Sequence, residues 1–126
     1  MSASRIKPKT ILVTGAGGSL ARRVMARLMD RHQVIAVDFR RKVQTDAHIP
    51  SYQVDLSKRR FEDIFRDHPI DGVIHLGRIL TNEYSRFRRY NDNVLGTRRL
   101  FDLAEKYNVG KVVVHSTHFV YGADAY

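Results

Sequence analysis

The sequence contains no cysteine and no apolar run long enough to cross a membrane. Without cysteine there is no disulfide, no thiolate metal site and no cysteine nucleophile, which is typical of proteins in a reducing compartment. Residues 1–9 form a polar, basic lead-in that lacks the apolar core of a targeting signal. We therefore expect a cytoplasmic protein without a membrane-spanning segment.

Acidic residues are scarce: 13 stand against 22 lysines and arginines, which gives a formal net charge of +9. Such an excess raises nucleic acid as a partner. The arginines, however, occur in pairs that are spread along the chain, such as Arg22/Arg23 and Arg88/Arg89, rather than in one basic arm. This spread indicates that the arginines lie on solvated helix faces, and we expect no specific binding of nucleic acid.

The six histidines indicate no metal site, because they have no short, repeated spacing with carboxylates. His75 and His115 fall within apolar runs that predict buried strands, so we interpret them as core or hydrogen-bonded side chains. His115 and Ser116 do not form a catalytic pair, since neighbours along a strand point to opposite faces.

Residues 11–21 carry the clearest pattern. The apolar run 11–13 predicts a buried strand, which stops before three glycines and the start of a helical pattern. Glycine allows backbone N–H groups to approach an anion at the positive end of a helix. Gly15, Gly18 and Ala21 therefore predict a pyrophosphate cradle, with G-x-x-G-x-x-A in place of the general G-x-G-x-x-G fingerprint. The alternative is a tight turn with a purely structural role.

A second apolar run, residues 34–37, ends in Asp38, where an acidic residue is expected to meet the adenosine ribose. Strand, glycine turn, helix, strand and acid form one unit that favours a dinucleotide-binding function. Asp38 indicates NAD, because a carboxylate accepts the 2′-hydroxyl and repels a 2′-phosphate. Arg40 and Arg41 follow closely and are compatible with NADP.

Short apolar segments alternate with helical patterns along the whole chain. The expected strands are Thr10–Thr14, Val34–Val37, Tyr52–Val54, Gly72–Leu76 and Lys111–His115. The expected helices are Gly18–Arg31, Lys58–Asp67 and Ser85–Tyr107. This alternation predicts one α/β domain over residues 10–126, a Rossmann-type doubly wound parallel sheet with the strand order 3-2-1-4-5. The ligand crevice is expected at the carboxyl ends of the strands.

The helical patterns also group the apolar side chains. In the first helix the stripe that packs against the sheet is expected to be Leu20, Val24 and Leu28. In the second, the residues expected to face inward are Phe61, Ile64 and Phe65. In the third, one face carries Tyr90, Val94, Thr97, Phe101 and Ala104.

From Thr10 onward the sequence resembles the N-terminal part of the extended short-chain dehydrogenase/reductases, the NAD-dependent epimerase/dehydratase group that includes sugar-nucleotide epimerases. The segments that carry the resemblance are, in order, Thr14–Ala21 (Thr-Gly-Ala-Gly-Gly-Ser-Leu-Ala), Asp38, Asp55-Leu56, Val73–Gly77 (Val-Ile-His-Leu-Gly), Asn93–Thr97 (Asn-Val-Leu-Gly-Thr), Ser116-Thr117 and Val120–Gly122 (Val-Tyr-Gly). Each segment is modest alone, and their order makes the match specific.

The resemblance implies a role for each matching residue. The residues implied to bind the cofactor are Gly15, Gly18, Ser19 and Leu20 around the pyrophosphate, Asp38 at the ribose, Asp55 and Leu56 beside the adenine, and Leu76 and Gly77 along the cofactor path. Asn93 would support the site from the long helix. Thr117 matches the Ser/Thr that hydrogen-bonds the substrate hydroxyl or carbonyl, and Ser116 would lie beside it.

One part of the family's pattern is missing. The family's catalytic Tyr-x-x-x-Lys should lie some tens of residues beyond Val120–Gly122, and the sequence ends at Tyr126. The match at Tyr107 and Lys111 is interpreted as a coincidence, because it precedes Thr117 and contains the helix breaker Gly110. In this family the tyrosine is the general acid/base, so we expect little or no turnover from this chain.

Two functions therefore fit the sequence. The first is the cofactor-binding portion of a longer NAD(P)-dependent epimerase/dehydratase or reductase, which acts on a sugar nucleotide or a related hydroxyl or carbonyl substrate and is compatible with a homodimer. The second is a non-catalytic NAD(P)-binding module, either regulatory or a remnant.

Overall fold

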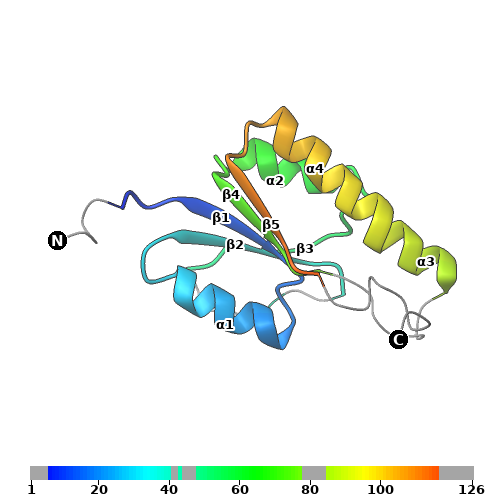
Figure 1. Ribbon diagram of the computed structural model, residues 1–126, viewed down its shortest axis with the longest axis horizontal. Coiled ribbons are helices and arrows are strands. Elements are labelled where there is room, and N and C mark those ends of the chain that lie inside the picture. The colour runs from blue at the N-terminus through cyan, green and yellow to red at the C-terminus, as the bar shows by residue number, and fades with distance from the viewer. Residues whose placement is uncertain (1–5, 41–42, 44–47, 78–84, 117–126) are drawn as a thin grey trace, which may run out of the picture.

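The computed structural model describes residues 6–40, 43, 48–77 and 85–116, which build a parallel sheet with helices on both faces (Figure 1). The sheet has five strands in the order β3-β2-β1-β4-β5, and all neighbouring pairs are parallel. The strands are β1 (Thr10–Thr14), β2 (Gln33–Asp38), β3 (Ser51–Gln53), β4 (Gly72–His75) and β5 (Lys111–Val114). The predicted Rossmann-type fold and its strand order are therefore confirmed.

Helix α1 (Ser19–Leu28) lies on one face of the sheet, and α2 (Arg60–Asp67) and α4 (Gly96–Lys106) lie on the other (Figure 1). Successive strand residues point to opposite faces, so the sheet supplies two cores. Leu12 packs in the core with residues of α2 and α4, whereas Val13 packs in the core with residues of α1. This double cover is why the central strands are continuous apolar runs.

The face of α1 that packs on the sheet agrees only in part with the predicted stripe: Leu28 packs against the core, but Leu20 does not. Ala21 and Met25 are the buried residues of this helix, whereas Leu20 is 45% exposed. The small side chain of Ala21, which stands at the third position of the glycine motif, allows the helix to approach the strand closely. The helix therefore turns Ala21 and Met25 inward, and Leu20 lies towards the carboxyl ends of the strands.

Helix α2 agrees with the prediction. Phe61, Ile64 and Phe65 are buried as expected. The rings of Phe61 and Phe65 meet edge to face, with their centroids 5.4 Å apart. In this helix the bulky residues themselves form the contact with the sheet.

The helix predicted over Ser85–Tyr107 is interrupted. It consists of α3 (Arg86–Tyr90), a π-helical turn η2 (Asn91–Leu95) and α4, which follow one another as a single rod in Figure 1. Its N-terminus is capped by Ser85, whose Oγ accepts a hydrogen bond from the backbone N–H of Arg88 at 3.1 Å.

The buried face of this rod agrees only in part with the predicted face, because Ala104 is buried and Thr97 is partly buried as expected. Tyr90, Val94 and Phe101 are exposed. The buried residues of α4 are Gly96, Leu100, Leu103 and Ala104. A Cβ atom at Gly96 would stand 3.3 Å from Cβ of Leu56, so the glycine marks the point of closest packing. As at Ala21 in α1, a small residue stands where the helix comes close to the rest of the protein.

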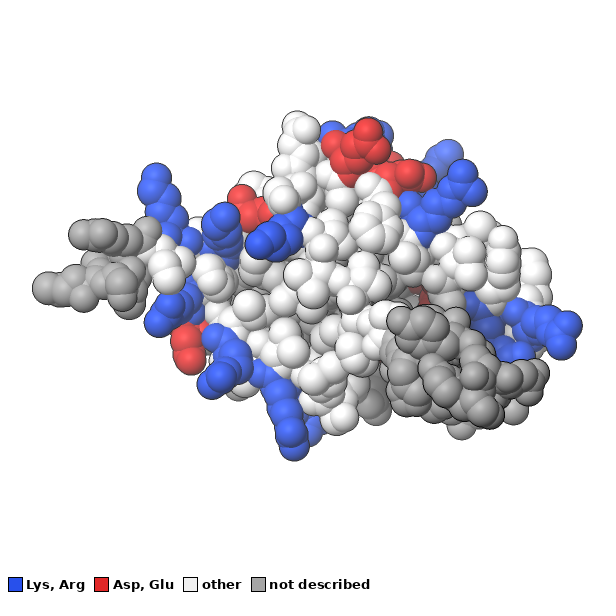
Figure 2. All heavy atoms as spheres, viewed as in Figure 1, with Lys and Arg blue, Asp and Glu red and all other residues white. Residues whose placement is uncertain are grey.

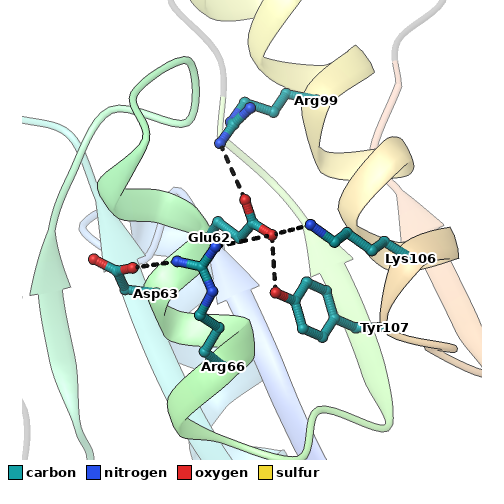
Figure 3. A network of polar contacts seen from close by, with 6 residues as sticks. All are labelled: Glu62, Asp63, Arg66, Arg99, Lys106 and Tyr107. Carbon is teal, nitrogen blue, oxygen red and sulfur yellow. Dashed lines mark hydrogen bonds and ion pairs between the residues drawn. The ribbon is translucent and has the colours of Figure 1, made fainter.

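A polar network joins α2 to the C-terminal end of α4 (Figure 3). Glu62 is its centre: its Oε2 accepts hydrogen bonds from Lys106 Nζ at 2.7 Å and from the hydroxyl of Tyr107 at 2.8 Å. Arg66 and Arg99 lie 3.5 Å and 3.9 Å from the same carboxylate. The hydrogen bonds from Lys106 and Tyr107 lower the pKa of Glu62 to about 2, so the carboxylate is ionised at neutral pH.

Strand β5 is an edge of the described sheet, and it is not the buried strand that the sequence predicts. Val113 and Val114 are 48% and 44% exposed although they point to opposite faces, and His115 is exposed as well. The apolar pattern was correct for the strand itself, and Val112 packs against the core that α2 and α4 supply, but Val113 and Val114 are left exposed by the described residues. An apolar strand can thus stand at an edge with only part of its length covered.

Lysine and arginine side chains are dispersed around the face in Figure 2 and do not gather into one patch. Their distribution agrees with solvated helix faces. Among the residues that the structure describes, no helix has the length and apolar character needed to span a bilayer.

Candidate functional site

A cavity of about 420 Å³ opens at the carboxyl ends of β1, β2 and β4, where parallel α/β sheets bind ligands. Its walls are the turns after these strands, the start of α1 and the first turn of η2. The residues that line it among those predicted to bind a cofactor are Gly15, Gly18, Ser19, Leu20, Asp38, Arg40, Leu56, Leu76 and Gly77. The structure therefore brings together most of the residues that the sequence motifs single out.

Other predicted residues lie elsewhere. Asp55, Asn93 and Ser116 do not line this cavity in the described part of the chain. Thr117, the predicted substrate-binding residue, lies outside the described residues. Tyr107 ends α4 and donates its hydroxyl to Glu62, while Lys111 begins β5, so this Tyr-x-x-x-Lys match does not share a helix.

The turns after β1 and β4 meet at a point that only glycine permits. Gly15 has a φ of +67°, and a Cβ atom there would stand 2.5 Å from the Cα and N atoms of Gly77. Both the backbone conformation and this contact exclude a side chain. We call the contact between Gly15 and Gly77 the glycine crossing. It forms the floor of the cavity and leads the chain into α1.

The N-terminus of α1 opens into the cavity beside the glycine crossing. Gly18 is its N-cap and provides no side-chain hydrogen bond, and the first turn contains no acidic residue. Helix N-termini carry backbone N–H donors and a partial positive charge. An anion in the cavity can therefore take the place that a capping side chain has in other helices.

Asp38 lies at the end of β2 and is 9% exposed. Its Oδ2 accepts a hydrogen bond from the N–H of Gly17 at 2.8 Å, and its Oδ1 accepts one from the N–H of Arg40 at 2.9 Å. The carboxylate thus holds the glycine turn of β1 against β2. Each carboxylate oxygen has a second lone pair, so Asp38 keeps acceptor capacity for a ligand.

A buried chain of hydrogen bonds fixes the turn after β4. The Oγ1 of Thr14 accepts the N–H groups of Leu76 at 3.1 Å and Gly77 at 3.2 Å, so its own proton points to Nδ1 of His75 at 2.6 Å. His75 then carries its proton on Nε2 and donates it to Oγ1 of Thr97 at 2.7 Å. Burial lowers the pKa of His75 to about 4, which keeps the ring neutral. The predicted hydrogen-bonded core histidine is confirmed.

Asp55 anchors the rim of the cavity to the long helix. Its Oδ1 accepts the N–H and Oγ–H of Ser57 at 2.9 and 2.8 Å, and its Oδ2 forms an ion pair with Arg88 at 2.9 Å. The guanidinium of Arg88 lies 4.9 Å from the ring centroid of Phe39. Burial raises the pKa of Asp55, but the hydrogen bonds from Ser57 and the charge of Arg88 outweigh it and lower the pKa overall.

The sequence model of the NAD dependent epimerase/dehydratase family matches residues 11–126. The chain belongs to this family. The resemblance that the sequence motifs indicate is therefore confirmed.

Relatives of this family member share its fold but are much longer. The UDP-glucose 4-epimerase of Neisseria meningitidis serogroup C is 33% identical over 129 residues, which cover 90% of this chain and 38% of that protein. The structure of the UDP-glucose 4-epimerase from Bifidobacterium longum in complex with NAD+ and UDP has a TM-score of 0.78 at 27% identity, and covers 90% of this chain and 38% of its own. The Bordetella bronchiseptica enzyme WbmG, at 18% identity, has the same fold with a TM-score of 0.85 over 94% of this chain and 40% of its own.

The described cavity fits the dinucleotide that the family's name implies. The glycine crossing holds the turns after β1 and β4 together at the floor of the cavity, and the uncapped N-terminus of α1 beside it suits a diphosphate. Asp38 offers a carboxylate where a ribose is expected, and Leu56 adds an apolar wall.

The sequence reasoning missed Asp92, an acidic residue of the cavity wall. It is 7% exposed, and its Oδ1 has no hydrogen-bond partner among the described residues. Burial, followed by the charge of Asp55, raises the pKa of Asp92 to about 6. The motif match pointed to the next residue, Asn93, because a π-helical turn cannot be read from residue spacing. The only available signal was the spacing of four residues between Asp92 and Gly96, which puts both on one helix face.

Proposed function

We propose that this chain is the NAD-binding part of an epimerase or dehydratase that acts on a sugar nucleotide. The observation that carries the proposal is the glycine crossing beside the uncapped N-terminus of α1, with Asp38 at the end of the neighbouring strand. Backbone N–H groups at such a helix start bind a diphosphate, and a carboxylate at that strand end binds a ribose.

Each wall of the cavity then contacts one part of the cofactor. Gly15, Gly18, Ser19 and Leu20 surround the diphosphate, and Asp38 accepts hydrogen bonds from the ribose hydroxyls. Leu56 borders the adenine beside Asp55, and Leu76 and Gly77 line the path towards the nicotinamide. Asn93 and Ser116 support the site from outside the cavity wall. The bound cofactor supplies reversible oxidation of a sugar carbon, and the protein supplies position and charge.

NAD is preferred over NADP in this proposal. Hydrogen bonds from Gly17 and Arg40 hold the carboxylate of Asp38 in place, so it cannot turn away from a 2′-phosphate without losing both. Arg40, whose guanidinium lies 5.5 Å from the ring centroid of Phe39, is the residue that would partly offset this repulsion.

The substrate class follows from the relatives. Two of those named here are UDP-glucose 4-epimerases, and the chain spans about 38% of their length. Thr117 is proposed to hydrogen-bond the reacting hydroxyl of a UDP-sugar. Residues 118–126 contain no Tyr-x-x-x-Lys, so we propose that this chain binds the cofactor without turnover.

Isothermal titration calorimetry of the 126-residue chain with NAD and NADP tests the proposal. We expect NAD to bind, with an affinity on the order of tenfold higher than that of NADP, because a like charge beside Asp38 costs more than 1 kcal/mol. A chain that is folded by circular dichroism and takes up neither dinucleotide at millimolar concentration would falsify the proposal.

A matched pair of glycine variants locates the binding site. A Cβ atom at Gly18 meets only the carbonyl of Gly15 at 3.4 Å, and one at Gly110 meets only the carbonyl of Asp71 at 3.4 Å. Both G18A and G110A should therefore fold. G18A narrows the cavity and should weaken NAD binding severalfold, whereas G110A lies outside it and should not.

A further inference from the structure

A second cavity, of about 500 Å³, opens at the amino ends of β1 and β2, at the end of the sheet opposite the dinucleotide cavity. Its walls are the first residues of these two strands, the residues that follow α1 and α2, and the segment before β3. Its volume lies in the range of small-molecule binding sites. The two cavities share no lining residue, so a molecule bound here would be a second ligand.

The lining of this cavity combines apolar side chains with imidazole rings. Its apolar residues are Met29, Val34, Ile35, Ile49, Pro50 and Pro69. Three histidines, His32, His48 and His68, supply most of its polar atoms. The described residues that line it include no aspartate, glutamate, lysine or arginine. The cavity therefore offers ring nitrogens beside apolar surface, without a carboxylate that would repel an anion.

His32 is held in place through one of its two ring nitrogens. The backbone N–H of Lys9 donates to Nδ1 of His32 at 3.0 Å, and the N–H of Gln33 donates to the carbonyl of Lys9 at 2.9 Å. Because Nδ1 accepts a hydrogen bond, the proton of the neutral ring lies on Nε2. Nε2–H has no hydrogen-bond partner within the part of the chain that the structure describes, so it can donate to a ligand.

His68, which follows α2, is held in the same way. Its Nε2 lies 2.8 Å from the hydroxyl of Tyr52, and the two rings meet edge to face with their centroids 5.9 Å apart. A phenol is a stronger acid than a neutral imidazole, so the hydroxyl donates and the ring carries its proton on Nδ1. His32 and His68 thus each line the cavity with one fixed ring and one N–H group to donate.

Two fixed N–H donors beside apolar walls suit a small organic acid. A carboxylate accepts two hydrogen bonds, and bonds to an ionised acceptor are about twice as strong as neutral ones. A phosphate would bring a second charge, and no lysine or arginine of the described lining offsets it. A metal ion does not fit either, because no three histidine or acidic groups among the described residues could hold one.

We propose that this cavity binds a small organic carboxylate. Its oxygens accept hydrogen bonds from Nε2–H of His32 and Nδ1–H of His68, while its apolar body packs on the apolar lining. We call the cavity the organic-acid site. Binding here is separate from the proposed cofactor binding, since it uses the opposite end of the sheet and none of the same residues.

The first test uses benzoate as the probe and follows the amide signals of the 126-residue chain by NMR. Benzoate in the millimolar range should shift the signals of Gln33 and His68 and leave those of Gly15 and Gly18 in place. Benzamide has the same shape without the charge, so it should bind on the order of tenfold more weakly. Inorganic phosphate should also bind this site more weakly than benzoate.

The second test removes the two donors one at a time. H32L and H68L should each weaken benzoate binding on the order of tenfold. H32Q and H68N are matched controls, because the amide nitrogen of glutamine can take the place of Nε2 and that of asparagine the place of Nδ1. Both should keep most of the affinity. H115A changes a histidine of the dinucleotide cavity and should bind benzoate as wild type does.

Several results would overturn the inference. Benzoate that shifts Gly15 and Gly18 instead of Gln33 and His68 binds in the other cavity, and the inference is then wrong. Equal affinity for benzamide, tighter binding of phosphate, full affinity in H32L and H68L, or no shift at about 10 mM benzoate would each contradict it as well. If a leucine variant does not fold, the location of the shifts and the comparison with benzamide still decide. The titration with NAD is a separate experiment, so failure of one proposal leaves the other standing.

Discussion

Gly15 is the residue on which the path of the chain through the cavity depends. Its φ of +67° lies in the left-handed region, and the backbone of Gly77 leaves no space for a Cβ atom. A non-glycine residue in this region costs about 1–2 kcal/mol before any clash is counted. G15A should lower the free energy of unfolding in urea by more than that, because the clash is with backbone atoms. G18A is the control, since Gly18 has a φ of −81°, and equal stability of the two variants would contradict the argument.

His75 and Asp92 have opposite effects on stability in the same pH range. The pKa of His75 falls from 6.5 to about 4 on folding, so its contribution is complete above 6.5 and is lost as the pH falls towards 4. The pKa of Asp92 rises from 3.8 to about 6, so its ionisation destabilises the fold as the pH rises through that range. Between about pH 4 and 6 the two effects offset each other.

Replacing Asp92 should reveal the effect of His75 on stability. D92N carries no buried charge, so its thermal unfolding midpoint at pH 7.5 should exceed that of wild type by a few degrees. On acidification from pH 6 towards 4, the midpoint of the variant should fall more steeply, because the loss from His75 is no longer offset. Differential scanning calorimetry at several pH values measures the unfolding midpoint at pH 7.5 and its fall on acidification, and D102N, which changes an exposed acid on the same helical rod, is the control. Parallel curves for wild type and D92N would exclude this account.

The network around Glu62, which joins α2 to α4 (Figure 3), should also make the stability of the fold depend on pH. The pKa of Glu62 is lowered to about 2, chiefly by the hydrogen bond from Lys106, so its contribution to stability is present above 4.5 and is lost as the pH falls through about 2. E62Q should lower the unfolding midpoint at pH 7 and flatten its fall between pH 4.5 and 2. D63N removes an exposed acid that pairs with Arg66 and should change little. If D63N has the larger effect, the network does not join the two helices.

The strands and their order could be predicted from the sequence because apolar runs and the glycine turn are local signals. The packing faces of α1 and of the long helical rod could not. Bulky residues such as Leu20 and Phe101 dominate an apolar pattern, whereas the observed contacts are made around Ala21 and Gly96, whose small size allows close approach. Whether a bulky or a small residue faces the sheet depends on the distance between helix and sheet, which is a property of the assembled fold.

The candidate site, too, could be predicted from the sequence only in part. Gly15, Gly18 and Asp38 belong to one short unit of sequence, and their places at the strand ends follow from the topology of parallel sheets. Asp92 could not be found in this way, because its position depends on an extra residue in one helical turn. The hydrogen bonds that join Thr14, His75 and Thr97 could not be predicted either, since the two hydroxyl groups and the imidazole ring meet only in the folded protein.

The uncovered edge at β5 concerns the behaviour of the molecule as a whole. The order of the described sheet ends with β5, and Val113 and Val114 are exposed on its two faces. The chain also spans about 38% of the length of the relatives compared with it. An apolar edge strand with open N–H and C=O groups is a template for pairing with another chain.

We therefore expect the 126-residue chain to associate with itself through β5 as its concentration rises. V114K places a charge on the edge strand and should shift sedimentation-velocity profiles towards the monomer, with an unfolding midpoint close to that of wild type because Val114 is already 44% exposed. V94K is the matched control: Val94 is 47% exposed but lies on η2, away from the sheet edge. Association that persists in V114K and disappears in V94K would place the contact on the helical rod instead of on β5.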